Sequence, residues 1–121
     1  MDDSQNVKKW DIQDYELENL TPLKALRILV ECFYVAQGGR FEHREGTEEK
    51  EPVDKDSFHQ ILDVVKSAFK EVGGDFIYPT KETLRKVVEL LAAKAEVWGT
   101  PPEIIAHHKS QILKVLDYLD D

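Results

Sequence analysis

The chain has 121 residues, of which 24 are acidic and 16 basic, so its formal net charge at pH 7 is −8. This length suits one domain that can bury a core without disulfides or a metal. The excess of acidic residues repels phosphate backbones and anionic lipid surfaces at long range, which disfavours nucleic acids and membranes as partners.

Cys32 is the only cysteine of the chain, so no internal disulfide can form. Its apolar neighbours predict a small buried side chain, and a lone thiol fits a reducing compartment. The first residues carry no basic start followed by an apolar run, so we predict neither a signal peptide nor a membrane anchor. We therefore expect a soluble protein of the cytoplasm.

The N-terminal part carries little periodic signal. Residues 1–9 are polar, and we expect them to be disordered. Between Trp10 and Leu20 the apolar residues are spaced irregularly, which fits either an arm docked on the core or a short helix. In both cases the expected anchors are Trp10 and Tyr15, because aromatic side chains bury large apolar areas.

The first helix is predicted from Pro22 to Gln37. Thr21 stands at the N-cap position before Pro22, whose ring favours the first helical position. Gly38 and Gly39 follow the last helical residue and supply a left-handed stop.

Charged residues form only one narrow stripe on this helix, made by Lys24, Arg27 and Glu31. Apolar residues occupy most of the remaining circumference, so the helix must be covered on several sides. The other helices or a second copy of the chain can supply that cover, and we predict self-association through this helix. The residues predicted to lie at the interface are Ile28, Cys32 and Val35.

Residues 40–53 mix acidic and basic side chains around Gly46 and Pro52 and show no periodic apolar pattern. We predict a long flexible loop here, with an acidic, disordered part at residues 42–52. His43 has Glu42 and Glu45 nearby, but a flexible loop cannot preorganise a tight metal site. The sequence predicts no bound metal and no cofactor.

The second helix is predicted to begin at Asp54, a residue type that caps helices. Val53 and Phe58 stand in the positions of a hydrophobic staple around this cap. A stripe of apolar residues at helical spacing follows, and Gly73–Gly74 ends the helix.

The linker at residues 75–79 carries large apolar side chains, which we expect to lie against the core. Thr80 is the predicted N-cap of the third helix, and Gly99 is its stop. The apolar residues of this helix recur at helical spacing, and they place Trp98 on the buried face together with Leu91.

The fourth helix is predicted to begin in the run Thr100-Pro101-Pro102-Glu103. A threonine cap, a proline in the first turn and a glutamate three residues after the cap form a capping box. Together the elements predict an all-α, four-helix bundle-like single domain covering residues 1–121. An N-terminal arm and a long acidic loop after the first helix complete it.

His107 is the candidate for phosphoryl chemistry, because helical spacing puts it opposite Ile112 and therefore in solvent. His108 falls near the apolar face, where we expect a half-buried, hydrogen-bonded ring. The run from Ala106 to Ser110 resembles the active helix of histidine phosphotransfer modules, which are acidic four-helix bundles with an exposed histidine. The resemblance implies that His107 is a phosphoacceptor, but the chain departs from the family at Ser110, where the family has a lysine.

Lys81, Arg85 and Lys86 form the best local basic patch, on the outer face of the third helix. Glu82 and Glu89 interrupt this patch, and the same charges fit salt links on a helix surface. Small helical subunits of RNA-guided complexes share this size and class, so RNA binding within a larger complex is a further alternative.

The sequence contains no nucleophile elbow, Walker loop or dinucleotide fingerprint. We therefore predict no catalytic residue and no enzyme activity. The leading interpretation is a non-catalytic protein–protein interaction or assembly module that forms homo-oligomers. A histidine phosphotransfer-like module and a small RNA-binding subunit are the alternatives.

Overall fold

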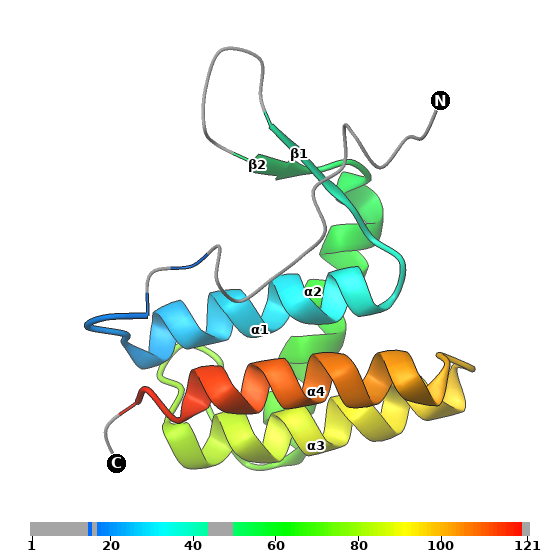
Figure 1. Ribbon diagram of the computed structural model, residues 1–121. Helices are drawn as coiled ribbons and strands as arrows, with labels where there is room; N and C mark the ends of the chain where they lie inside the picture. Colours follow the sequence, from blue (N-terminus) through cyan, green and yellow to red (C-terminus); the bar gives the residue numbers. More distant parts are fainter. Residues whose placement is uncertain (1–14, 16, 44–49, 120–121) are drawn as a thin grey trace.

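The computed structural model describes residues 15, 17–43 and 50–119 (Figure 1). Within these residues the chain is mostly helical, and its helices pack on one another as an all-α bundle-like domain, so the predicted fold class is confirmed. The elements in chain order are α1 (Pro22–Ala36), β1 (Phe41–His43), β2 (Lys50–Pro52), α2 (Lys55–Glu71), α3 (Lys81–Val97) and α4 (Pro102–Leu116). The disorder predicted for residues 1–9 concerns a segment outside the described part.

Three helices lie side by side and the remaining one crosses them. In Figure 1, α4 lies next to α1 and α3 and runs opposite to both, while α2 crosses behind this layer. In the same view the strands β1 and β2 lie above the C-terminal half of α1, next to the start of α2. Tyr15, Leu17 and Leu20 pack against the core, so the described part of the N-terminal segment is a docked arm without helix.

Side-chain caps set the start of α1, α2 and α3 as predicted. The Thr21 hydroxyl accepts a hydrogen bond of 3.2 Å from the backbone N–H of Lys24. Asp54 and Thr80 cap α2 and α3 in the same way. At the other end of α1, Gly38 has a φ of +91°, a left-handed conformation that glycine adopts without strain.

The start of α4 differs from the prediction. Its N-cap is Pro101, and no side chain bonds to the N–H groups of its first turn. The Thr100 hydroxyl instead donates a hydrogen bond of 3.1 Å to Oε1 of Gln37, which lies 63 residues earlier at the end of α1. The predicted capping box is therefore wrong, because the α3–α4 turn lies against α1 and the hydroxyl finds a tertiary partner there.

Regular structure is present in the segment 40–53, where a loop was expected. The strands β1 and β2 pair antiparallel, with Phe41 opposite Pro52. The Phe41 ring meets the rings of Tyr34 and Phe58 edge to face, with centroids 5.2 and 6.1 Å away. These contacts hold the strand pair against α1 and α2. Residues 44–49, the middle of the predicted acidic loop, lie outside the described part.

Other helices of the same chain enclose α1. Ile28 and Cys32 are each 3% exposed, and Val35 is partly buried against the core. Glu31 belongs to the charged stripe that was expected to face solvent, but it is only 5% exposed. Within one chain α1 contacts α2, α3 and α4, and self-association through Ile28, Cys32 and Val35 stays a prediction.

The reactivity of the Cys32 thiol can be used to test whether α1 is buried. The thiol donates to the carbonyl oxygen of His108 at 3.7 Å, and burial raises the pKa of this group above its ordinary value. We expect a thiol reagent to leave Cys32 unmodified in the folded protein at mildly alkaline pH and to modify it fully in denaturant, as measured by mass spectrometry. Fast modification of the folded protein would show that α1 is open to solvent at this position.

Candidate binding groove

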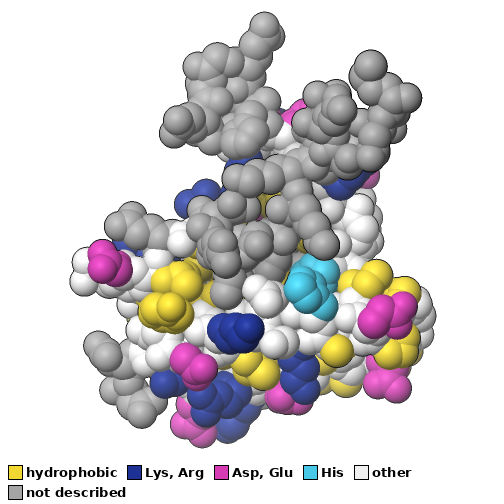
Figure 2. Space-filling model, in the orientation of Figure 1, with side chains coloured by type: hydrophobic (Ala, Val, Ile, Leu, Met, Phe, Trp, Pro, Cys, Tyr) yellow, Lys and Arg dark blue, Asp and Glu magenta, His cyan; other side chains and the backbone are white. Residues whose placement is uncertain are grey.

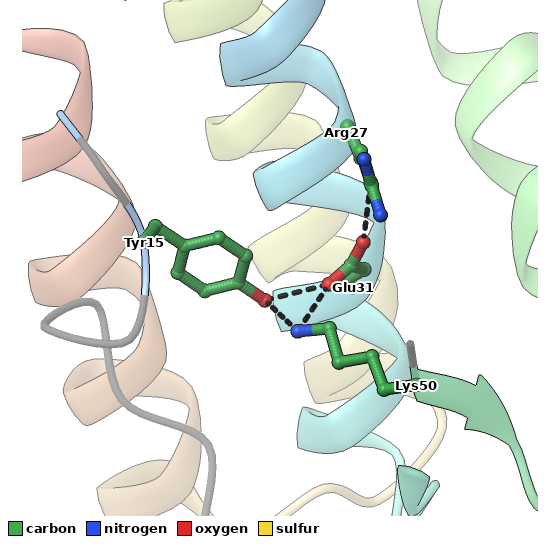
Figure 3. A network of polar contacts seen from close by, with 4 residues as sticks. All are labelled: Tyr15, Arg27, Glu31 and Lys50. Atoms are coloured by element: carbon green, nitrogen blue, oxygen red, sulfur yellow. Dashed lines mark hydrogen bonds and ion pairs between the residues drawn. The ribbon is translucent and has the colours of Figure 1, made fainter. Parts of the chain in front are cut away.

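Glu31 is the charged side chain that α1 buries, and Figure 3 shows the polar groups around it. Arg27 reaches one carboxylate oxygen, with 3.0 Å between its Nε and Oε2 of Glu31. Tyr15 and Lys50 both reach the other oxygen, Oε1, at 2.7 Å, and the Lys50 ammonium also donates to the Tyr15 hydroxyl at 2.9 Å. This Glu31 network joins the N-terminal arm and β2 to α1.

The burial of the Glu31 carboxylate explains why the network forms. A carboxylate removed from water is stable only when cations and hydrogen-bond donors surround it. The Lys50 ammonium supplies charge, and it also lies 4.4 Å from the ring centroid of Tyr15 and 5.1 Å from that of Phe41. Both carboxylate oxygens of Glu31 are engaged in hydrogen bonds and ion pairs. The network therefore has a structural role, and its carboxylate is not free to act as a general acid or base.

A groove of about 540 Å³ lies between the C-terminal end of α1 and the first half of α2. Its volume falls in the range of sites that take small ligands or short peptide segments. We call it the α1–α2 groove, and its lining residues are Tyr34, Gln37, Gly38, Gly39, Arg40, Val53, Asp54, Ser57, Gln60, Ile61, Val64 and Trp98.

Tyr34 holds the wall of the groove on the α1 side. Its hydroxyl donates to the carbonyl oxygen of Arg40 at 3.2 Å and accepts from the backbone N–H of Asp54 at 3.4 Å. A side chain at Gly39 would overlap the Tyr34 ring, so the chain can pass this close only as glycine. The turn after α1 and the start of α2 are therefore fixed by one buried tyrosine.

Two donor groups of the groove have no acceptor in the described part of the chain. The Nε2 atom of Gln37 is buried without a hydrogen-bond partner there, although Oε1 of the same amide accepts from Thr100. The Arg40 guanidinium is exposed, and within the same residues no hydrogen bond or ion pair to it is found. A buried donor without an acceptor is unfavourable by about 1–3 kcal/mol, so an acceptor from a ligand would stabilise Gln37.

Asp54 is the acidic group of the groove, and its oxygens are engaged in the cap of α2. The backbone N–H of Ser57 donates to it at 3.1 Å and the Ser57 hydroxyl at 2.8 Å. These two bonds lower the pKa of the Asp54 carboxyl below its ordinary value of 3.8. The carboxylate is therefore a helix cap rather than a general base.

Trp98 lines the groove from the C-cap of α3 and is more exposed than predicted. It was expected on the buried face of the third helix, but it is 49% exposed. The indole contacts the Phe33 ring at a centroid distance of 5.9 Å and keeps much of its remaining surface open. Helical spacing assigns a residue to a face, but Trp98 is the C-cap of α3, and about half of its side chain is exposed there.

A smaller hollow of about 50 Å³ lies between α1, α3 and α4, beside Cys32. Apolar side chains form most of its lining, and its polar members are already engaged. Lys109 pairs with Glu89 at 2.8 Å, and Nδ1 of His108 lies 2.9 Å from the carbonyl oxygen of Ile104. We interpret this hollow as a gap in core packing, because no convergent polar groups accompany it.

His107 is exposed on α4, and His108 is half-buried, which are the positions that helical spacing predicted. The two rings meet edge to face with centroids 5.2 Å apart. Ser110 is exposed one turn beyond His107, where histidine phosphotransfer modules have a lysine. The phosphoacceptor role of His107 stays a prediction.

The predicted basic patch is divided among other partners. The Lys81 ammonium donates to the carbonyl oxygen of Leu119 at 3.1 Å, and Lys86 pairs with Glu82 at 3.4 Å. Arg85 is exposed. Figure 2 shows basic and acidic side chains interspersed along the lower part of the face that it displays. An RNA-binding role of these three cations stays a prediction.

No family model, curated protein or solved structure matches the chain. Within residues 15, 17–43 and 50–119, no three His, Cys, Asp or Glu side chains come together in a way that could hold a metal ion. None of the helices in that part is long and apolar enough to cross a membrane. The groove itself is therefore the basis for inferring a function.

No residue of the α1–α2 groove was predicted from the sequence as a site. Gln37 was expected at the end of a helix and Trp98 in the core. The available signal was the position of Trp98 directly before the glycine that stops the third helix, since a large aromatic residue at a helix end need not be covered by neighbouring helices.

The Glu31 network predicts unequal costs for removing its two cations. The Arg27 side chain is 75% exposed, whereas the Lys50 side chain is 28% exposed. We expect Lys50→Met to lower the free energy of unfolding by about 2 kcal/mol, because the buried carboxylate loses a charged donor. The matched change Arg27→Met should lower it by less than about 1 kcal/mol, as for other exposed pairs. Chemical denaturation measures the free energy of unfolding of both variants. Equal decreases would contradict a buried carboxylate that depends mainly on Lys50.

The Asp54 cap predicts that the stability of the fold depends on pH. Because the pKa of Asp54 is lowered in the folded state, its stabilising contribution is full above the ordinary pKa of 3.8 and is lost as the pH falls through the folded value. Asp54→Ala should therefore lower Tm at neutral pH, and the difference from wild type should narrow in strong acid. Asp56→Ala is the control, since it removes the same charge from the first turn of α2. If both variants behaved alike, the effect would come from charge alone.

Proposed function

We propose that the protein is a non-catalytic protein-binding module and that the α1–α2 groove is its recognition surface. One observation carries the proposal: a half-exposed Trp98 ring lies in the same groove as two donors, Gln37 Nε2 and the Arg40 guanidinium, that lack acceptors within the described residues. Tryptophan and arginine are enriched among the residues that contribute most to protein–protein binding.

The rigidity of the groove supports the proposal. Tyr34 bonds to both Arg40 and Asp54, and Asp54 in turn caps α2 through Ser57. Walls that are already held before a partner arrives lose little conformational freedom on binding, so more of the contact energy appears as affinity.

The chemistry of the groove favours binding over catalysis. Asp54 is its carboxylate, and the cap engages both oxygens. The other polar side chains include the Gln37 and Gln60 amides and the Arg40 guanidinium, which do not exchange protons near neutral pH. Such groups orient a partner by hydrogen bonds and do not move protons.

The proposal places the partner at the groove and not on α1. Ile28 and Cys32 are buried within one chain, which supports a partner bound at the groove rather than at these two residues. We propose a different protein as the partner. The lone buried thiol suits a reducing compartment, and we propose the cytoplasm as the location.

Trp98→Ala tests the proposal. Peptides selected against the full chain from a displayed library of random short sequences should bind wild type and should bind this variant at least about tenfold more weakly by calorimetry. Val97→Ala is the matched control, because Val97 is 84% exposed and does not line the groove. Its affinity should equal that of wild type.

Trp98→Ala also removes the contact between the Trp98 and Phe33 rings, which contributes to folding. A second variant that leaves this contact in place is therefore needed. Val53→Arg changes the wall formed by the start of α2 and should also weaken binding, while thermal unfolding reports whether each variant is folded. Selected peptides that bind both folded variants as tightly as wild type would lie elsewhere on the surface and would overturn the proposal.

A further inference from the structure

We infer that the α1–α2 groove binds a short extended segment of a neutral or basic partner protein, through backbone carbonyl groups and one large apolar side chain. The inference rests on the proposed function and adds the chemistry of the ligand. It follows from which hydrogen bonds the groove lacks, what its apolar surface offers and how its charges are arranged.

The unused polar groups of the groove are donors. Nε2 of Gln37 is buried and unpartnered in the described structure, and its amide oxygen is already held by the Thr100 hydroxyl at 3.1 Å. The Arg40 side chain carries only donors, and its backbone oxygen accepts from Tyr34 and from the N–H of Val53. A ligand that fits must therefore bring acceptors.

An extended segment offers such acceptors, whereas a helix does not. Backbone carbonyl groups inside an α-helix are already bonded to N–H groups of the same helix, so a docked helix presents side chains and few free carbonyl oxygens. An extended chain keeps its carbonyl groups free on both edges. The two unmatched donors thus favour a segment that passes over Gln37 and Arg40 without helical structure.

The apolar part of the groove fits one large side chain. Trp98 is 49% exposed, and Ile61 and Val64 of α2 also line the groove. An aromatic or long aliphatic side chain can pack on the open part of the indole while the adjacent backbone reaches Gln37. The volume of about 540 Å³ suits a few residues of this kind rather than a folded domain.

The net charge of the whole chain, rather than the charges within the groove, disfavours an acidic segment. Arg40 and Asp54 bring one positive and one negative side chain to the same groove, so their fields largely offset each other. The chain as a whole carries a net charge of −8, which attracts basic and repels acidic partners at long range. A neutral core with basic flanks is therefore the expected composition.

Gln37→Leu tests the role of the amide, and Thr100→Val is its matched control. Both variants remove the hydrogen bond between Thr100 and Gln37, but only Gln37→Leu removes the Nε2 donor. The probes are peptides selected as ligands from the displayed library, titrated into the full chain by calorimetry. We expect Gln37→Leu to weaken binding about tenfold and Thr100→Val to change it by less than about twofold.

Nuclear magnetic resonance completes the test, because the side-chain NH₂ of Gln37 and the indole N–H of Trp98 give separate signals. Bound peptides should shift both signals, and the selected sequences should be neutral or basic and extended in the complex. Equal weakening by both variants, unchanged affinity of Gln37→Leu, helical bound peptides or acidic sequences would each overturn the inference.

The outcomes also separate this inference from the proposed function. Peptides that depend on Trp98 but not on Gln37 would leave the groove as a binding surface and refute the carbonyl contact. Groove signals that move only with protein concentration would identify a second copy as the occupant and refute the inference. If no selected peptide moves the groove signals, both proposals fail.

Discussion

Much of α1 is apolar and buried, and the rest of the structure packs around this helix. Glu31 is an acidic side chain of α1 that is buried in the described structure, and a buried carboxylate is stable only with donors around it. Arg27 reaches it from the same helix, but Lys50 and Tyr15 come from outside the helical layer. The strand pair and the N-terminal arm are thus held on α1 by a charge that α1 cannot satisfy alone (Figure 3).

The same arrangement determines where the groove lies. Lys50 holds β2 against α1, and the strand pair brings Arg40 and Val53 together at the end of α1 through a backbone bond of 2.9 Å. Tyr34 then joins Arg40 to Asp54, so the turn after α1 and the cap of α2 share one anchor. A continuous series of contacts through the strand pair therefore joins the Glu31 network to the groove walls.

Local signals predicted the helices because caps and stops act within a few residues. Thr21 bonds to the N–H group three residues ahead, and a glycine after the helix accepts the left-handed turn whatever surrounds it. The strands escaped prediction because each has three residues and depends on contacts of Phe41 with distant rings. The charged stripe correctly predicted that Lys24 and Arg27 are exposed, but it was wrong for Glu31, which Tyr15 and Lys50 contact from outside the helix.

The candidate groove was hidden from the sequence for a related reason. Thr100 has every local feature of a helix cap, yet the α3–α4 turn lies against the end of α1, and the hydroxyl bonds to Gln37 instead. That bond engages the oxygen of the amide and leaves its nitrogen without a partner among the described residues, beside an indole that the core does not cover. Where Thr100 and Trp98 depart from their local rules, the tertiary structure has given the groove its donor and its apolar surface. Thr100 and Trp98, which do not behave as their local sequence predicts, therefore indicate the candidate site better than any motif in the chain.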